Sequence, residues 1–441
     1  MEQRRKNLTQ LFIPICLETL LYMLSGMVDT LMLSSVNDQA VGAVGTANTY
    51  IGIFIIMFSV ISSGMVAVMT QNIGAGRPGV AYQARQLGLV FNAALGVIMS
   101  LFLSLGAGTI LSGVGVADAL MQPAKTYLQI VGGFCILNAL IPICSSYLRA
   151  FGFSKEPLYA SIIGNVINFC LNAFFLFVLH KGVAGVATAT VISRIINLVI
   201  VVLLGAVLVK AKQHPERESN RAVMGQIIRI GLPSACETAI YNVSMTLVIR
   251  FLNQMDAQGL NVTARSYTMQ ITNFSYCVGA ALAQANAIMT GWHIGAKEYD
   301  ACDRGTKKAA VIGVIVAVIL ETVFTLCSGW IMQLFSKDPQ MVSLVGKLLA
   351  IDIVLEIGRV TNLVYGQALK TSGDAVFPVV MGVCFMILCS VGGTYLFGIR
   401  LGLLAVGAYI GMAGDECVRA VGMYLRWKSG KWKEKGLVKS R

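Results

Sequence analysis

Charged residues are scarce in this chain. Asp, Glu, Lys and Arg make up 12% of its 441 residues, whereas 56% are hydrophobic and the mean hydropathy is +0.73. A soluble domain carries about 25% charged residues. The chain therefore has too few polar side chains to cover a globular surface in water, which excludes an ordinary cytosolic enzyme. Lipid is the alternative solvent, and at about 20 to 25 residues per span the length accommodates about twelve helices.

Histidine is rare and cysteine forms no motif. The three histidines are His180, His214 and His293, and none has a partner at metal-binding spacing. The eleven cysteines are scattered singly, without a CxxC pair. This pattern argues against a zinc site or a disulfide framework. No serine or metal motif lies at the end of a span, which argues against hydrolysis or metal chemistry. We therefore expect neither an enzyme nor a bound cofactor.

Apolar runs predict an all-α, polytopic membrane protein with about twelve transmembrane helices. We expect spans near residues 8–33, 46–72, 86–112, 124–148, 157–180, 185–209, 228–252, 266–292, 308–334, 343–370, 376–397 and 401–427. The long polar stretch 211–226 suggests a division into an N-terminal six-helix lobe (1–210), a cytoplasmic linker (211–226), a C-terminal six-helix lobe (227–428) and a basic cytoplasmic tail (429–441). The basic start of the chain lacks a short apolar core and a cleavage site, so we expect a retained first span.

The net charge of +13 is distributed as in a membrane protein, not as in a nucleic-acid-binding one. Most of the 34 Lys and Arg residues lie at the N-terminus, in alternate loops and in the tail. The opposite loops and adjoining helix ends hold only Lys125, Lys181, Arg250, Arg265, Lys337 and Arg400. Because basic loops stay in the cytoplasm, we expect a multi-pass protein of the plasma (inner) membrane with both termini cytoplasmic.

The two halves of the sequence repeat each other. Pro14–Tyr22 (PICLETLLY) recurs as Pro233–Tyr241 (PSACETAIY), with four identities at an offset of 219. Ile73-Gly-Ala recurs at Ile294, and Leu148-Arg149 recurs as Leu369-Lys370, each at an offset of 221. Because each half has six spans, both copies cross the membrane in the same direction. Such a parallel internal repeat is typical of two-lobed transporters with the substrate path between the lobes.

Ionisable residues inside the predicted spans are candidate functional groups, because each costs at least about 2.5–3.5 kcal/mol at a helix centre. Glu18, Tyr22 and Asp29 lie on one stripe of the first helix. The seventh helix repeats the stripe with Glu237 and Tyr241, but Val248 stands where the first has Asp29.

The N-terminal half also contains amide and hydroxyl oxygens within its predicted spans, a set that the C-terminal half lacks. Asn168 and Asn172 share one face of the fifth helix, and Thr190 lies on the sixth. A carboxylate with such oxygens suits a proton or a sodium ion. The alternative is that the amide and hydroxyl groups only join helix to helix, each bond contributing about 0.6–2 kcal/mol.

The tenth helix carries a second charged group. Asp352, Glu356 and Arg359 follow one another at helical spacing, so they are candidates for the substrate path together with the glutamates and tyrosines of the first and seventh helices. The alternative is a neutralising Glu356–Arg359 pair, which costs less to bury than either charge alone.

Taken in order, these segments resemble the multidrug and toxic compound extrusion (MATE) family, in particular its DNA-damage-inducible branch. The resemblance covers essentially the whole chain. It rests on Val28-Asp-Thr30, Gln71–Ala75, Leu148–Gly152, Asn168–Asn172, Gly185–Thr190, Leu355–Asn362 and Gly373-Asp374.

The resemblance implies secondary-active efflux of cationic, amphipathic compounds by antiport with H+ or Na+. It also implies a coupling-ion site at Asp29, Asn168, Asn172 and Thr190. Many relatives have aspartate at position 172, so this chain favours protons, although Na+ could bind at Asp29. Sodium-driven relatives of another branch carry a glutamate eight residues after the helix-seven proline, where this chain has Tyr241.

A lipid or lipid-linked sugar flippase of the same superfamily is the alternative. A strongly basic cavity would favour that function, but the embedded charges here are mostly acidic. We expect small-molecule cargo, membrane lipid as the surroundings, no nucleic acid partner and a monomer.

Overall fold

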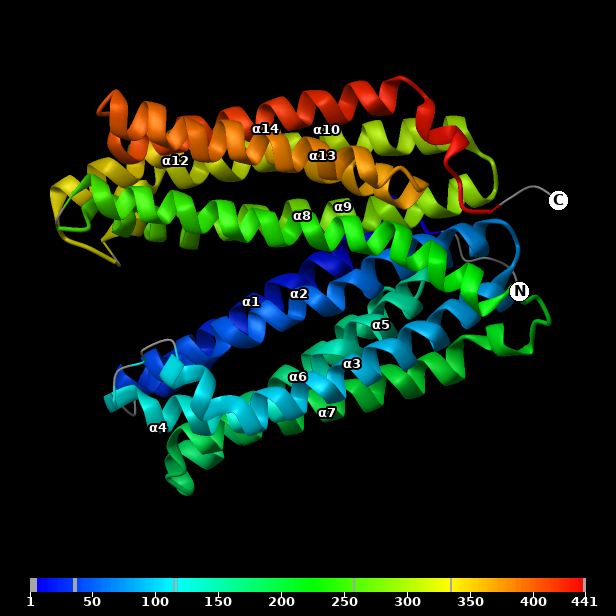
Figure 1. Ribbon diagram of the computed structural model, residues 1–441, viewed down its shortest axis with the longest axis horizontal. Coiled ribbons are helices and arrows are strands. Elements are labelled where there is room, and N and C mark those ends of the chain that lie inside the picture. Colours follow the sequence, from blue (N-terminus) through cyan, green and yellow to red (C-terminus); the bar gives the residue numbers. More distant parts are fainter. Residues whose placement is uncertain are drawn as a thin grey trace. The chain divides into compact units, whose positions relative to one another are not determined.

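The computed structural model describes residues 6–34, 38–113, 116, 118–256, 258–333 and 335–438, without the side chains of Asp38, Ser59, Ala119, Lys212 and Gln213. Residues 1–5 at the predicted N-terminus and 439–441 of the predicted tail lie outside this part of the chain. The described chain forms two compact units, Met1–Leu232 and Pro233–Arg441. In Figure 1 the long helices of each unit lie side by side along a common direction.

The first unit is entirely helical over its described residues. Its elements are α1 (Leu8–Ser34), α2 (Asp38–Gly74), α3 (Pro78–Gly113), α4 (Asp118–Tyr127), η1 (Leu128–Gly132), α5 (Ile136–Ala150), α6 (Lys155–Ala173), η2 (Phe174–Val178), α7 (Gly182–Leu208), η3 (Lys210–Gln213) and the start of α8 (Asn220–Met255). A core of buried side chains joins α2, α3, α5 and α7, with Leu103, Leu111 and Leu128 among its fully buried members.

The second unit has the same character. Its elements are the remainder of α8, α9 (Leu260–Gly295), α10 (Tyr299–Leu326), α11 (Ser328–Met332), α12 (Pro339–Ser372), α13 (Val376–Phe385), η4 (Met386–Val391), η5 (Thr394–Arg400), α14 (Leu404–Lys428) and η6 (Lys431–Glu434). Its core joins α8, α9, α12 and α14, and it includes Val248, Leu252 and Tyr409.

The predicted spans are present. Seven described helices are long and apolar enough to cross a membrane, and a bent pair of helices gives an eighth. The remaining spans correspond to α8, α9, α12 and α14, which carry more charged and polar residues. The twelve-helix, two-lobe architecture therefore fits the described chain.

The fourth span is broken, which the sequence did not predict. Leu120–Gly132 and Ile136–Ala150 meet at 43°. The break follows the π-helical turn η1, where Gly132 lies so close to α3 that an added methyl group would come within 3.0 Å of Leu103 Cβ. A π-turn and an adjacent pair of glycines are recognised causes of such kinks.

The predicted linker is partly helical. Its last seven residues form the first two turns of α8, because Val223 and the nearby Ile227 are fully buried in the first unit. Polar contacts hold the part before the helix, where Arg217 donates to the Gly79 carbonyl at 2.7 Å and Glu218 pairs with Arg77 at 2.6 Å.

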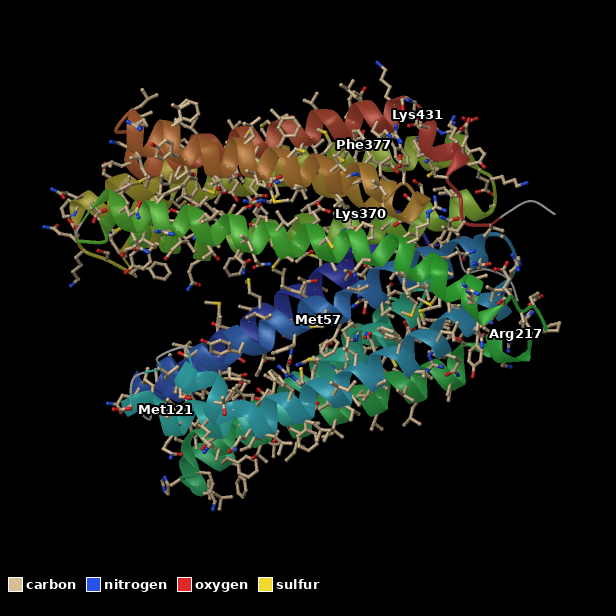
Figure 2. All side chains as sticks on the ribbon, viewed as in Figure 1. Met57, Met121, Arg217, Lys370, Phe377 and Lys431 are labelled. Atoms are coloured by element: carbon tan, nitrogen blue, oxygen red, sulfur yellow. The ribbon has the colours of Figure 1, made fainter. Side chains whose placement is uncertain are left out.

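The first residues of the predicted tail are folded against the second unit. After Gly430, which has a φ of 73°, Trp432 stacks on Trp427 with 4.1 Å between ring centroids, and both indoles are buried. The Trp432 indole N–H donates to the Trp427 carbonyl at 2.9 Å. Lys431, labelled in Figure 2, stays exposed on the same segment.

Candidate functional site

Asp29 lies in a polar cluster within the first unit. It is on the second half of α1, and its Oδ1 accepts a hydrogen bond of 2.7 Å from the side-chain amide of Asn172 on α6. The same amide donates to Asn168 Oδ1, one turn earlier on α6, at 3.2 Å. Both asparagines are buried, and Asn172 is fully so. The structure therefore brings together three of the four predicted coupling-ion residues.

Thr190, the fourth predicted residue, is buried on α7, and its hydroxyl donates to the Val186 carbonyl of its own helix at 2.9 Å. The structure shows no hydrogen bond from Thr190 to Asp29 among the described contacts. As a ligand of the coupling ion, Thr190 stays a prediction.

Arg194 and Tyr127 are further polar residues whose charges act on or respond to Asp29. Arg194 lies one turn beyond Thr190 on α7 and attracts the Asp29 carboxylate, and Tyr127 at the end of α4 is buried within the electrostatic influence of both groups. The sequence pattern alone predicts no role for either residue. The spacing of Arg194 from Thr190 places both on one face of a helix, and that signal could have found the arginine.

The second unit has no equivalent carboxylate. Val248 occupies the position that corresponds to Asp29, and it is fully buried in the apolar core beside Leu252. The second unit thus has an apolar side chain in its core where the first unit has the Asp29 carboxylate. A titratable group at this register occurs on α1 but not on α8.

The predicted stripes on the first and seventh helices each contain an ion-paired glutamate and an exposed tyrosine. Glu18 forms an ion pair of 2.5 Å with Arg149, and Glu237 forms one of 2.6 Å with Lys370. The tyrosines one turn later are exposed: Tyr22 by 68% and Tyr241 by 38%. The tyrosines are therefore available to a ligand, whereas the glutamates are occupied by cations of their own unit.

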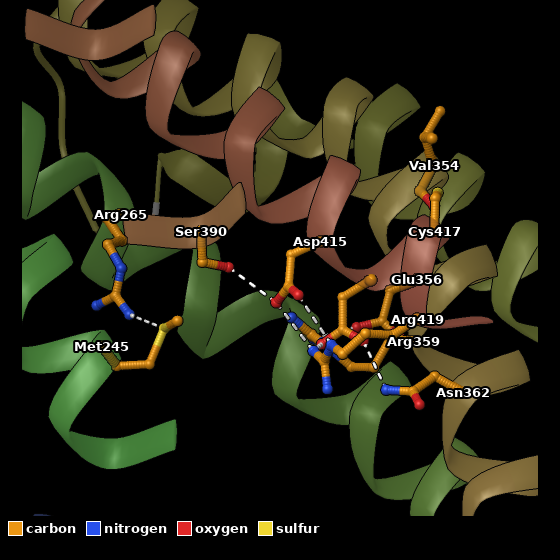
Figure 3. A network of polar contacts seen from close by, with 11 residues as sticks. Met245, Arg265, Val354, Glu356, Arg359, Asn362, Ser390, Asp415, Cys417 and Arg419 are labelled. Carbon is orange, nitrogen blue, oxygen red and sulfur yellow. Dashed lines mark hydrogen bonds and ion pairs between the residues drawn. The ribbon is translucent and has the colours of Figure 1, made fainter. Parts of the chain in front are cut away.

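A network of buried charges joins α12 to α14 in the second unit (Figure 3). The Glu356–Arg359 pair exists as the sequence suggested. It is extended by Glu416, whose Oε1 lies 3.7 Å from Arg359 Nε and 2.8 Å from Arg419 Nη2. Arg419 also donates from Nε to Asp415 Oδ1 at 2.9 Å.

Polar side chains complete this α12–α14 network. Asn362 donates its amide to Glu416 Oε2 at 3.0 Å, and the Ser390 hydroxyl donates to Asp415 Oδ2 at 2.9 Å. Since a buried ion pair is tolerated only with good geometry and additional hydrogen bonds, these donors offset part of the desolvation. The sequence pattern alone predicts no role for Asp415, Glu416 or Arg419. Glu416 and Arg419 have the same three-residue spacing as Glu356 and Arg359, and this signal could have found them.

The α12–α14 network has an excess of carboxylate. Glu356, Asp415 and Glu416 surround two guanidinium groups, and Asp352 lies buried one turn before Glu356. Asp352 Oδ2 and Glu356 Oε2 are buried without a hydrogen-bond partner among the described residues. The two guanidinium groups already have carboxylate partners within this network.

A comparison with known families agrees with the internal repeat of the sequence. The MatE family model matches residues 14–174 and residues 233–396. The two matches begin at Pro14 and Pro233, the first positions of the internal repeat. The chain belongs to the MATE transporter family. It is therefore a transporter and not an enzyme.

Relatives of this MATE transporter extend over the whole chain. An uncharacterized transporter, YisQ of Bacillus subtilis, is 34% identical over 96% of this chain and 94% of its own length. The probable multidrug resistance protein NorM of Thermotoga maritima is 23% identical over 98% of this chain and 94% of its own. A crystal structure of a MATE protein in a bent conformation superposes with a TM-score of 0.86 at 18% identity, covering 97% of this chain and 96% of the other. That likeness shows the shared fold.

Proposed function

We propose that this MATE transporter is a secondary-active antiporter, which exports cationic, amphipathic organic compounds in exchange for protons by alternating access of its two lobes. The observation that carries the proposal is the hydrogen bond between Asp29 and the buried amide of Asn172. It places one carboxylate, with one amide donor and a nearby arginine, inside a membrane-spanning lobe. Such intramembrane carboxylates mark proton or ion pathways.

The amide of Asn172 makes the first lobe sensitive to the charge on Asp29. An ionised carboxylate accepts this N–H strongly, since hydrogen bonds to charged acceptors are about twice as strong as neutral ones. When a proton arrives from outside, the charge is lost and the bond to Asn172 weakens. The outer half of α1 then repacks against α6, and this movement drives release of the cargo.

The carboxylate excess of the α12–α14 network supports a cationic cargo. Asp352 and Glu356 of the second unit supply acidic groups, and the exposed ring of Tyr241 on α8 of the same unit supplies an aromatic face, which attracts organic cations. Arg359 neutralises part of the acidic charge rather than binding an anion. Cargo binding by Glu18 and Glu237 stays a prediction, because both carboxylates are ion-paired within their own lobes.

Uptake of a fluorescent lipophilic cation into proteoliposomes tests the proposal. A pH gradient and a sodium gradient are imposed separately on wild type, on Asp29→Asn and on the matched control Asp300→Asn, which alters an exposed carboxylate at the start of α10. We expect the pH gradient alone to drive dye movement in wild type and in the control but not in Asp29→Asn. Full transport by Asp29→Asn would refute the coupling role of this residue.

The other outcomes distinguish the alternatives. Movement on the sodium gradient alone would assign Na+ as the coupling ion. Movement on neither gradient would favour the flippase, and lipid-linked sugars would be the next cargo tested. We further propose a monomer in the plasma membrane with both termini cytoplasmic, supported by the presence of both repeat halves in one chain and by the loop charges.

A further inference from the structure

The ion pairs of Glu18 and Glu237 are the same interhelical contact, present once in each unit. In the first unit, Arg149 Nη2 at the end of α5 donates to Glu18 Oε2 at 2.5 Å. In the second, Nζ of Lys370, labelled in Figure 2 near the end of α12, lies 2.6 Å from Glu237 Oε2. The partners are related by the same internal repeat, and all four side chains are at most 15% exposed.

A third helix joins each pair at the same register. The Ser161 hydroxyl on α6 donates to Glu18 Oε1 at 3.4 Å. The position 221 residues later is Gly382 on α13, where an added methyl group would lie 3.2 Å from Cγ and Oε1 of Glu237. Each glutamate therefore connects the first helix of its unit to the fourth and fifth spans of that unit.

The two first helices differ beyond these ion pairs. On α1 no residue between 16 and 32 is buried, and the next buried residue is Leu33. On α8 the corresponding stretch 235–251 includes the buried residues Ser244 and Val248, and Leu252, the counterpart of Leu33, is buried as well. The far part of α8 is therefore packed more deeply than the far part of α1. At the level where α8 buries Val248, α1 has Asp29 and its hydrogen bond to Asn172.

We propose that Glu18 and Arg149 are positioning residues for transport: their ion pair fixes the inner part of α1, so that a change at Asp29 moves only the outer part of that helix. The Glu237–Lys370 pair fixes α8 in the same way, but in a lobe whose first helix stays in place. Glu18 and Asp29 are eleven residues apart, about 17 Å along a helix. The ion pair of Glu18 with Arg149 therefore holds the inner part of α1 while the hydrogen bond of Asp29 with Asn172 is released.

The role of the pair in coupling rests on the proposed antiport, so two measurements are needed. The first is coupled dye export in proteoliposomes together with proton leak without dye. For Glu18→Gln and for Arg149→Gln we expect export to fall about tenfold, as for loss of a charged hydrogen bond, and proton leak to rise. The exchanged pair Glu18→Arg with Arg149→Glu should recover most of the export. The matched variants Glu237→Gln and Lys370→Gln should lower export without raising the leak.

The second measurement does not depend on transport. Spin labels carried by azide-bearing amino acids are placed at Leu24 and Ile163 in the first unit, and at the repeat positions Val243 and Cys384 in the second; all four side chains are exposed. Double electron–electron resonance then gives the distance distribution of each pair. We expect Glu18→Gln to broaden the first distribution and the exchanged pair to narrow it again. Glu237→Gln should leave the second distribution unchanged.

The outcomes separate the two ideas. If wild type moves no dye on either gradient, the antiport proposal fails, while the label distances still test the positioning role. An unchanged first distribution in Glu18→Gln, or equal broadening in both units, would overturn the positioning role even if transport were gradient-driven. Broadening confined to the first unit, together with recovery in the exchanged pair, supports it.

Discussion

Asn172 illustrates how one side chain sets the chemistry of the coupling site. It is fully buried, and its amide N–H groups donate to Asp29 and to Asn168, so the one carboxylate of this cluster accepts a hydrogen bond from a buried amide. A donor amide suits an anionic oxygen that accepts protons, whereas a site for sodium requires several oxygen ligands. This arrangement supports the proposed coupling to protons.

We predict that Asn172→Asp gives the transporter a response to sodium. A second carboxylate replaces the amide donor and faces Asp29, which supplies the charge and the oxygens that bind a hard cation. A sodium gradient should then drive dye movement beyond that of wild type. Asn242→Asp, at an exposed amide on α8, is the control. A variant that ignores sodium would argue against this view of the site.

Asp256 is a second residue whose ionisation matters, and it lies outside the spans. Its carboxylate accepts hydrogen bonds from the backbone N–H groups of Leu260 at 2.9 Å and Asn261 at 3.0 Å, at the start of α9. Slight burial raises the pKa of Asp256, but hydrogen bonds from Asn261, Leu260 and Gly259 outweigh it and lower the pKa below its usual range.

We predict that Asp256→Ala lowers the free energy of unfolding by about 1 kcal/mol, the usual effect of removing a helix cap. Because the folded pKa is depressed, this contribution is present above the unfolded pKa of about 3.9 and is lost as the pH falls through the folded value. Thermal unfolding of detergent-solubilised protein at pH 7 and near pH 3 measures the difference. An equal loss at both pH values would contradict the assignment.

At the scale of the element, glycine decides how closely α12 and α14 approach. A methyl group added at Gly358 would lie 2.7 Å from the Cys417 backbone nitrogen and 2.8 Å from the Glu416 carbonyl carbon. Gly358 lies between Glu356 and Arg359 along α12. The glycine therefore allows the approach on which the ion pairs to Glu416 depend.

We predict that Gly358→Ala destabilises the protein by about 1–3 kcal/mol, the usual effect of overpacking. Gly305→Ala on α10 is the control, since nothing lies within 4 Å of its added methyl group, and it should stabilise the helix by about 0.5–1 kcal/mol. Thermal unfolding in detergent compares the two variants. A higher midpoint for Gly358→Ala would show that the helices can separate without loss.

At the scale of the whole molecule, the distribution of loop charge decides the orientation. The described helices correspond to twelve spans, and an even number places both termini on one side. The exposed lysines of the folded C-terminal segment, including Lys428, Lys431 and Lys433, belong to the more basic side. Basic segments are retained in the cytoplasm.

We predict that a fluorescent protein fused after the C-terminus is bright and that alkaline phosphatase fused there is inactive. Alkaline phosphatase inserted after Lys181, in a loop of the less basic side, should be active. Both reporters are measured in intact cells. Phosphatase activity at the C-terminus would reverse the orientation.

The sequence by itself determined the helical spans and the internal repeat, and its family resemblance pointed to Asp29 and the two asparagines, which the tertiary structure brings together. Apolar run length, loop charge and helical spacing are local properties, and in lipid every span must satisfy its own backbone hydrogen bonds. The tertiary structure decided the partners of Glu18 and Glu237, the bend in the fourth span and the extension of the Glu356–Arg359 pair by α14. These features depend on side chains far apart in the chain. Only the packing of several helices fixes which charge meets which.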